Sequence, residues 1–204
     1  HHTARDWTRG EVLRDPYFYA LLSCVLAPPF IGTTIFFHQD YLVELRGYSP
    51  LAFAAAFPLK AVTTVLFALV CGQLVDRFGA PRLLPLFLLP LAVASAAAAY
   101  LSSAWGVYVF MILIGVSYGF TSTLLGALWP EVYGVKHLGA IRAVIVAVMV
   151  FSTALGPGLT GALIDAGIDL PTQLVWMSVW CLGACILMAF VSPRLVARAA
   201  ASHR

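Results

Sequence analysis

Six long apolar runs make up most of this sequence, and they constrain the fold more than any other feature. The runs cover residues 17–37, 51–75, 83–101, 105–129, 141–164 and 174–191. Each is long enough to cross a bilayer as an α-helix, which needs about 20 apolar residues. Because unpaired backbone groups are costly in hydrocarbon, a helix is the expected conformation of each run. Charged residues make up 10% of the chain, against about 25% in soluble domains. The sequence therefore predicts an all-α membrane protein with six transmembrane helices.

The basic residues other than Lys60 divide unequally between the two sides of this topology. One side carries only Arg46, and all the others lie on the opposite side. These others are Arg5, Arg9, Arg14, Arg77, Arg82, Lys136, Arg142, Arg194, Arg198 and Arg204. The positive-inside rule then predicts that both termini are cytoplasmic, in an inner or plasma membrane. We expect residues 1–15 to be a cytoplasmic linker, 16–192 the transmembrane domain and 193–204 a cytoplasmic tail.

Lys60 is a charged residue inside the second run. Counted from Pro50 at about 1.5 Å per residue, it lies roughly 15 Å along a helix, near the midplane of a hydrocarbon core about 30 Å thick. A charge there costs about 2.5–3.5 kcal/mol and marks a functional site by default. All nine acidic residues lie outside the runs, so the counter-charge must come from elsewhere. An acid from a missing part of the protein, an anionic substrate and a neutral amine are the alternatives, and we favour the substrate.

Other polar and aromatic side chains are candidates to line a substrate cavity with Lys60. They are Thr33, Thr34, Phe37, Thr64, Tyr118 and Thr121. The competing interpretation of each threonine is a hydrogen bond to a neighbouring backbone group, which is common in membrane helices. His38 follows the first run and is a candidate proton-coupling group, because histidine changes its charge near neutral pH. A solvated histidine at the membrane interface is the alternative.

The four cysteines all fall in apolar runs, where a thiol packs as a small hydrophobic group. We therefore predict packing roles for Cys24, Cys71, Cys181 and Cys185. The sequence indicates no metal site, no cofactor and no nucleic-acid partner.

A short pattern occurs twice, at the ends of the second and fifth runs. Gly72-x-Leu74-x-Asp76 and Gly161-x-Leu163-x-Asp165 share the same residues at the same spacing. The two runs are the middle members of two three-helix units, and they end on opposite sides of the membrane. This placement predicts two inverted three-helix repeats.

The first copy continues as Gly72-x-Leu74-x-Asp76-Arg77-x-Gly79-x-x-Arg82 and resembles the signature loop of the major facilitator superfamily. The resemblance covers nearly the whole chain, as the C-terminal six-helix half of a twelve-helix transporter. Two further segments resemble the monocarboxylate and oxalate–formate branch of that family. These are His38-Gln39-Asp40-Tyr41-Leu42 and Pro130-Glu131-x-Tyr133-Gly134-x-x-His137-x-Gly139.

The resemblance implies secondary transport of a small organic anion by alternating access, as symport with protons or as antiport. Carboxylate carriers of this family use a cationic residue in the second helix of this half, which is the role we expect for Lys60. The signature loop is a cytoplasmic latch in the family, and here its residues would be Gly72, Asp76, Arg77, Gly79 and Arg82 with Glu131 and Arg142 as further members. The N-terminal six-helix half, or a second copy of this chain, would complete the pathway through the lipid bilayer.

Two other classes of function compete with a carrier. Gly115-x-Ser117-x-Gly119 fits the Gly-x-Ser-x-Gly pattern of serine hydrolases, but that pattern requires a strand–turn–helix context and a histidine partner. We therefore expect no enzyme. A six-helix channel is the second alternative, and it would conduct passively where a carrier shows saturable counterflow. Gly115 and Gly119 are also spaced to let two helices approach closely.

Overall fold

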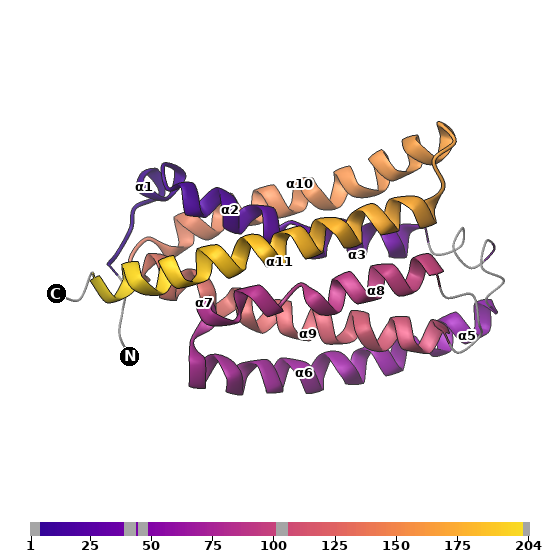
Figure 1. Cartoon of the computed structure of the whole chain (residues 1–204), viewed down its shortest axis with the longest axis horizontal. Helices are drawn as coiled ribbons and strands as arrows, with labels where there is room; N and C mark the ends of the chain where they lie inside the picture. The colour runs from indigo at the N-terminus through magenta and orange to yellow at the C-terminus, as the bar shows by residue number, and fades with distance from the viewer. Residues whose placement is uncertain (1–4, 39–43, 45–48, 101–105, 202–204) are drawn as a thin grey trace.

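The computed structural model describes residues 5–38, 44, 49–100 and 106–201, and all regular structure within these residues is helical. The helices form an elongated bundle (Figure 1). In chain order they are α1 (Arg9–Leu13), α2 (Pro16–Val25), α3 (Ala27–Phe37), α5 (Pro50–Ala55), α6 (Phe57–Phe78), α7 (Ala80–Leu83), the 3₁₀ helix η1 (Leu84–Leu86), α8 (Leu89–Tyr100), α9 (Gly106–Tyr133), α10 (Leu138–Asp165) and α11 (Leu170–Ala201).

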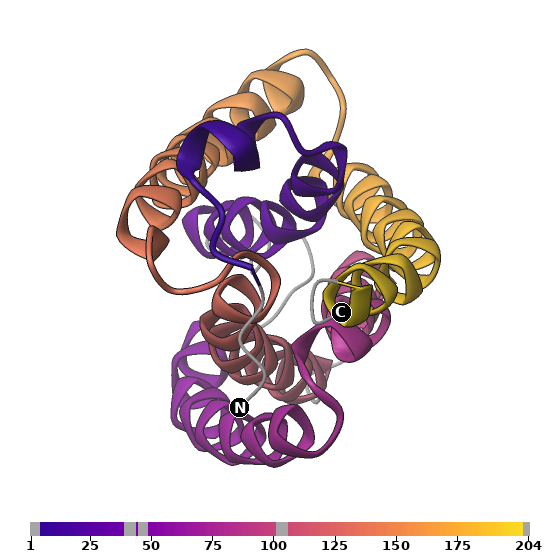
Figure 2. The same cartoon turned by 90° about the vertical axis from the view of Figure 1, so that its left-hand side faces the viewer.

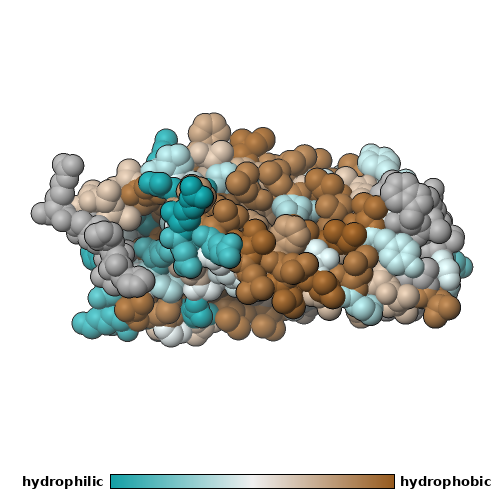
Figure 3. Space-filling model, turned by 90° about the horizontal axis from the view of Figure 1, so that it is seen from below, coloured by the Kyte–Doolittle hydropathy of each residue, from teal (hydrophilic) through white to brown (hydrophobic). Residues whose placement is uncertain are grey.

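Six helical segments in the described residues are long and apolar enough to cross a membrane, which confirms the predicted number. They are Pro16–Phe37, Phe57–Phe78, Ala80–Tyr100, Tyr108–Tyr133, Leu138–Asp165 and Leu170–Ala201. The surface shows an apolar belt across the middle of the bundle, with hydrophilic side chains gathered at one end (Figure 3). We call this the basic end, because it carries Arg77, Arg82, Lys136, Arg194 and Arg198. The ends of α3 and α10 and the start of α6 lie at the opposite end (Figure 1).

The helices pack in pairs that follow the predicted inverted repeat. α6 packs along α9, and α10 packs along α3. In the inverted repeat, the first, second and third spans correspond to the fourth, fifth and sixth. The α6–α9 pair then corresponds to the α10–α3 pair, and the contact of α8 with α9 corresponds to that of α11 with α2. α8 and α11 pack on each other and lie on the side of the bundle away from α6 and α10 (Figure 2).

Small residues allow the paired helices to approach closely. A Cβ atom added at Gly115 would lie 2.8 Å from the backbone oxygen of Lys60, and one at Gly119 would collide with the backbone oxygen of Thr64. On the other pair, a Cβ at Gly156 would lie 2.9 Å from the Phe30 backbone oxygen. These glycines therefore set the α6–α9 and α3–α10 distances, as the Gly-x-x-x-Gly spacing predicted for α9.

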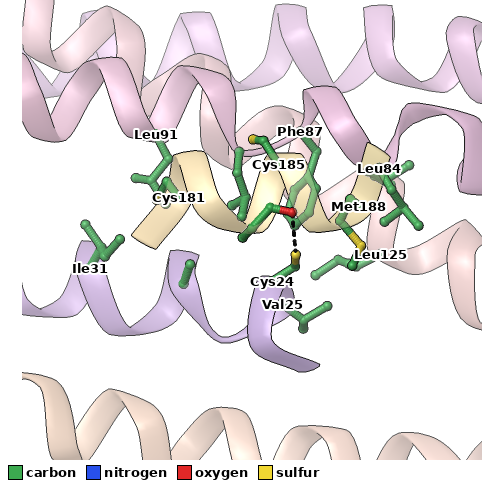
Figure 4. Close-up of a cluster of buried hydrophobic side chains, with 14 of the residues drawn as sticks. Cys24, Val25, Ile31, Leu84, Phe87, Leu91, Leu125, Cys181, Cys185 and Met188 are labelled. Carbon is green, nitrogen blue, oxygen red and sulfur yellow. Dashed lines mark hydrogen bonds between the residues drawn. The ribbon is translucent and has the colours of Figure 1, made fainter. Parts of the chain in front are cut away.

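The cysteines lie in the core, which confirms their predicted packing role. All four are free and buried. Cys24, Cys181 and Cys185 pack with Ile31 and Phe87 between α2, α3, α8 and α11 (Figure 4). The Cys24 thiol donates to the backbone oxygen of Ala184 at 3.5 Å.

The second span begins later than its apolar run. α5 ends at Ala55, and α6 begins at Phe57 with Pro58 in its first turn. Proline has no N–H to donate to the preceding turn, which explains the helix break at this position. Lys60 consequently lies in the first turn of α6. The midplane depth of Lys60 stays a prediction.

Candidate functional site

Two aromatic rings from neighbouring helices lie close to the Lys60 ammonium. The ammonium nitrogen lies 4.6 Å from the centre of the Tyr118 ring on α9 and 5.3 Å from the centre of the Phe36 ring on α3. The Phe36 ring in turn lies 5.6 Å from that of Phe57, one turn before Lys60 on α6. A cation over an aromatic face is stabilised by about 0.5–2 kcal/mol, depending on how far it is desolvated. We call Lys60, Phe36, Phe57 and Tyr118 the lysine–aromatic cluster.

Glycines place this cluster inside the bundle. The Lys60 backbone packs level with Gly115, which lies nine residues into α9, or about 13 Å from the start of that helix at 1.5 Å per residue. A Cβ at Gly32 of α3 would collide with the Tyr118 hydroxyl oxygen. Tyr118 therefore occupies space that only a glycine at position 32 leaves open, and α3 holds its ring beside the ammonium.

No described acid pairs with Lys60. Ion pairs in the described part of the chain join Arg5 to Glu11 and Arg198 to Asp15, and both lie at the basic end. The cluster therefore presents a partly buried ammonium whose described neighbours are rings and neutral groups. Such a site can bind a carboxylate or another monoanion.

The structure brings together some of the predicted cavity residues and separates others. Thr64 lies one turn from Lys60 and its hydroxyl donates to the Lys60 backbone oxygen at 2.8 Å.

Thr33 is half-buried on α3, whereas Thr34 is fully buried and faces Gly156 of α10. Phe37 is 72% exposed, and Thr121 is buried in α9. Lys60, Thr64 and Tyr118 thus lie together, while Thr34, Phe37 and Thr121 lie in other surroundings.

Phe36 and Phe57 are the members of the cluster that sequence reasoning missed, and Phe36 is the one that contacts the ammonium. Phe36 and Phe37 are adjacent, so one helical step decides which ring faces α6 and α9. The apolar run around them is hydrophobic on every side and gives no periodicity to choose between the two. The sequence signal that could have indicated Phe36 was the adjacent pair Phe36-Phe37, shortly after Thr33 and Thr34.

His38 ends α3 at the side opposite the basic end. Its Nδ1 lies 3.1 Å from the backbone oxygen of Thr34, a hydrogen bond that depends on the tautomer. A Cβ at Gly161 of α10 would lie 3.7 Å from its Nε2. The motif predicted from His38 to Leu42 continues into residues outside the described part of the chain, and Arg46 also lies outside it.

The signature loop forms a sharp turn at the basic end. Gly79 adopts a φ of 84° between α6 and α7, in the region that favours glycine. The Glu131 carboxylate on α9 accepts a hydrogen bond from the Ala80 backbone amide at 2.7 Å. Glu131 thus stabilises the start of α7 directly. Asp76 is exposed near the end of α6.

The arginines of the predicted latch do not contact Glu131. Arg77 is exposed, and its guanidinium lies 5.3 Å from the Phe78 ring. Arg82 is exposed and makes no ion pair with a described residue. Arg142 donates to the backbone oxygen of Gly126 at 2.8 Å, so it ties α10 to α9. In this conformation Glu131 holds the loop through the backbone alone.

A second polar cluster at the basic end was absent from the sequence predictions. Asp15 precedes α2 and is buried, with its side chain 3% exposed. Its carboxylate pairs with the Arg198 guanidinium of α11 at 2.9 Å and accepts from the Tyr133 hydroxyl of α9 at 2.9 Å. The guanidinium also lies 4.6 Å from the Trp7 ring and 5.1 Å from the Tyr17 ring. We call this set the basic-end clamp.

The clamp fastens the segment before α2 to the bundle. The Trp7 amide donates to the Tyr133 backbone oxygen at 2.9 Å, and the Asp6 carboxylate accepts from the Val135 and Lys136 amides at 3.2 and 3.3 Å. Gly134 turns the chain there with a φ of 77°. The described part of the expected linker is therefore packed against α9 and α11.

The Gly-x-Ser-x-Gly pattern lies within the continuous helix α9. Ser117 is fully buried, and its hydroxyl has no hydrogen-bond partner among the described residues. A nucleophile of this type needs an exposed hydroxyl on a sharp strand-to-helix turn. Helix α9 does not provide that geometry.

Comparison with known protein families gives a match that spans most of the sequence. The Major Facilitator Superfamily model matches residues 17–203. No curated protein matches the chain. The matched region contains all six membrane-spanning helices, the lysine–aromatic cluster and the signature loop. This chain belongs to the major facilitator superfamily of membrane transporters.

Proposed function

We propose that this chain moves a small organic monoanion, such as a monocarboxylate, across the membrane by alternating access. The observation that carries the proposal is the ammonium of Lys60, held between the Tyr118 and Phe36 rings with no described acid beside it. A substrate carboxylate would supply the missing negative charge. The other described lysine and arginine side chains lie at the basic end. The site therefore offers the substrate one ammonium charge, which favours a monoanion over a dianion.

The size of the interactions supports a substrate at this position. At the predicted midplane depth, the charge of Lys60 would cost about 2.5–3.5 kcal/mol. One ring face contributes about 0.5–2 kcal/mol, so two rings contribute about 1–4 kcal/mol, which is comparable with that cost. A bound carboxylate would add the opposite charge that no described residue supplies, and the ammonium would in turn stabilise the carboxylate. This complementarity gives the site a reason to select anions.

We further propose that the chain works as one six-helix half of a twelve-helix carrier. The symmetry-related helices α6 and α10 are the least buried of the six spans. Their outward faces carry large apolar side chains, including Val62, Leu66 and Leu69 on α6 and Val146, Val150 and Phe151 on α10. An N-terminal half, or a second copy of this chain, would cover these faces and rock against them.

The orientation of the chain in the membrane and the role of the signature loop are part of the same proposal. We place both termini in the cytoplasm of an inner or plasma membrane, because the basic end carries nearly all the positive charge. The signature loop, with Gly72, Asp76, Arg77, Gly79 and Arg82, would then close the cytoplasmic side. Arg77 would meet acids of the partner half. His38 at the opposite end would take part in proton coupling if transport is symport.

Counterflow in proteoliposomes tests the proposal, with labelled lactate and formate as probes. The protein is reconstituted and preloaded with the unlabelled anion, and uptake of the labelled anion is followed over time. A carrier predicts saturable uptake that rises transiently above equilibrium. Flux that increases linearly with concentration and shows no counterflow would instead indicate a passive channel. Empty liposomes provide the background.

A further inference from the structure

A groove runs beside α11 at the basic end, apart from the lysine–aromatic cluster. It has a volume of about 440 Å³ and is lined by Arg82, Ser192, Pro193, Val196, Ala197 and Ala200. The Ser192 hydroxyl donates to the backbone oxygen of Pro81 at 2.5 Å, so α7 is held against α11 and forms one wall. α11 lies on the side of the bundle away from α6 and α10, the helices proposed to meet the partner half (Figure 2).

The rim of this groove carries uncompensated positive charge. Arg82 belongs to the lining and is exposed, and Arg194 follows the lining residue Pro193 and is also exposed. Neither forms an ion pair in the described part of the chain, where Arg5 and Arg198 are the paired arginines. A guanidinium presents a fork of N–H donors that fits a phosphate group in a bidentate manner.

An apolar stripe leads from the groove toward the middle of α11. Ile186, Phe190, Pro193 and Ala197 follow one another at spacings of four, three and four, so they lie on one face of the helix. Ile186 is 61% exposed and Phe190 is 68% exposed. The groove therefore joins a cationic rim to an exposed apolar track within one continuous surface.

We propose that this surface binds an anionic phospholipid, with its phosphate at Arg82 and Arg194 and an acyl chain along Ile186 and Phe190. The position of the rim at the end of the apolar belt suits a headgroup, and the stripe suits the chain that follows it. A basic pocket beside membrane helices is a recognised way to hold acidic headgroups. A free phosphate would engage only the rim, and a zwitterionic lipid lacks the net charge that the two arginines select.

Native mass spectrometry of the full-length protein tests the proposal, with dioleoyl phosphatidylglycerol and dioleoyl phosphatidylcholine as probes. We expect phosphatidylglycerol to be retained preferentially, and Arg82→Gln or Arg194→Gln each to weaken that retention about fivefold. Arg9→Gln removes an equal charge from an exposed site elsewhere at the basic end and is expected to leave retention unchanged. Phe190→Ser is expected to weaken binding through the acyl chain.

Several outcomes would overturn the proposal. An equal loss of phosphatidylglycerol retention in Arg9→Gln would show that general surface charge, and not this groove, retains the lipid. Unchanged retention in both Arg82→Gln and Arg194→Gln would remove the site. Displacement of the lipid by equimolar inorganic phosphate would show that the rim alone binds and that the apolar track contributes nothing. Arg194→Gln lies on the outer surface of α11, so it keeps the test valid if Arg82→Gln disturbs the α6–α7 loop.

Discussion

The ammonium of Lys60 lies 4.6 Å from the centre of the Tyr118 ring, on the neighbouring helix α9. Tyr118 is kept there by the missing side chain of Gly32, since a Cβ at that position would collide with the tyrosine hydroxyl. The ring, the glycine and the lysine come from three helices that meet inside the bundle. Their arrangement makes the tyrosine ring a structural support of the charge, which mutation can test.

Replacing Tyr118 separates the contribution of its ring from that of its hydroxyl. Tyr118→Phe keeps the aromatic face and should leave uptake of a monoanion close to wild type. Tyr118→Ala removes the face and should raise the apparent KM about 2- to 30-fold, which corresponds to about 0.5–2 kcal/mol. Initial rates of lactate or formate uptake measure the effect. Tyr108→Ala, on a more exposed part of α9, is the matched control, and an equal change in that variant would refute the assignment.

Adding one methyl group at Gly32 should disturb the site without removing any of its charged or aromatic groups. Gly32→Ala forces the Tyr118 ring away from Lys60, because the hydroxyl cannot share the space. We expect a weaker apparent affinity for the anion and a loss of stability of about 1–3 kcal/mol from overpacking. Combining Gly32→Ala with Tyr118→Phe should recover part of the stability. A double variant no better than the single one would show that the collision is not the cause.

Breaking the basic-end clamp should destabilise the fold strongly. Arg198→Gln leaves the Asp15 carboxylate buried without its cation, and such a loss typically costs about 3–5 kcal/mol. The partly exposed guanidinium places the expected value at the lower end of that range. Thermal unfolding in detergent measures it, and limited proteolysis should cut sooner within the segment before α2. Arg194→Gln, one turn earlier and outside the clamp, should unfold like wild type.

The signature loop offers a matched pair of aspartates. Asp76→Asn should slow transport while the protein remains inserted, because Asp76 is proposed to act in the cytoplasmic latch. Asp165→Asn changes the equivalent residue of the second repeat, which lies at the opposite end of the bundle. We expect the second variant to retain its rate. Equal rates in both variants and wild type would remove the latch role of Asp76.

Glu131 connects the loop to α9, and its charge should contribute to stability. Glu131→Gln keeps a hydrogen-bond acceptor for the Ala80 amide but removes the negative charge at the start of α7. The expected loss is about 0.3–1 kcal/mol. Glu131→Ala removes the acceptor as well and should cost more, about 1–3 kcal/mol, because the amide is left without this partner. Unfolding curves of both variants measure these losses. A larger loss of stability in Glu131→Gln than in Glu131→Ala would contradict the prediction.

The spans could be predicted from the sequence because each depends on local composition. Their number and the close approach at Gly115 and Gly119 both follow from patterns within one segment. The break between α5 and α6 could not be predicted in the same way. Pro58 lies in the first turn of α6, and the apolar run continues through that break without any change in composition.

The two polar clusters show why the rest of the site needed the structure. Phe36 contacts Lys60 only because α3 is rotated to face α6 and α9, a rotation that an evenly apolar run does not encode. Asp15 and Arg198 lie near opposite ends of the sequence and meet through tertiary packing. In the sequence, Asp15 and Arg198 each stand as a charge near a helix end. The positive-inside rule accounts for Arg198 without an acidic partner, so the sequence did not indicate the pair.

Replacement of Lys60 tests the central claim most directly. Initial uptake of labelled lactate or formate is compared for wild type, Lys60→Gln and Lys136→Gln at equal amounts of inserted protein. Lys136 is the other lysine of the chain and lies exposed after α9. A charged hydrogen bond contributes about 1.5–3 kcal/mol, so Lys60→Gln should lower uptake by about tenfold or more while Lys136→Gln transports normally. Wild-type uptake by Lys60→Gln would contradict the role of Lys60 as the counter-charge of the transported anion.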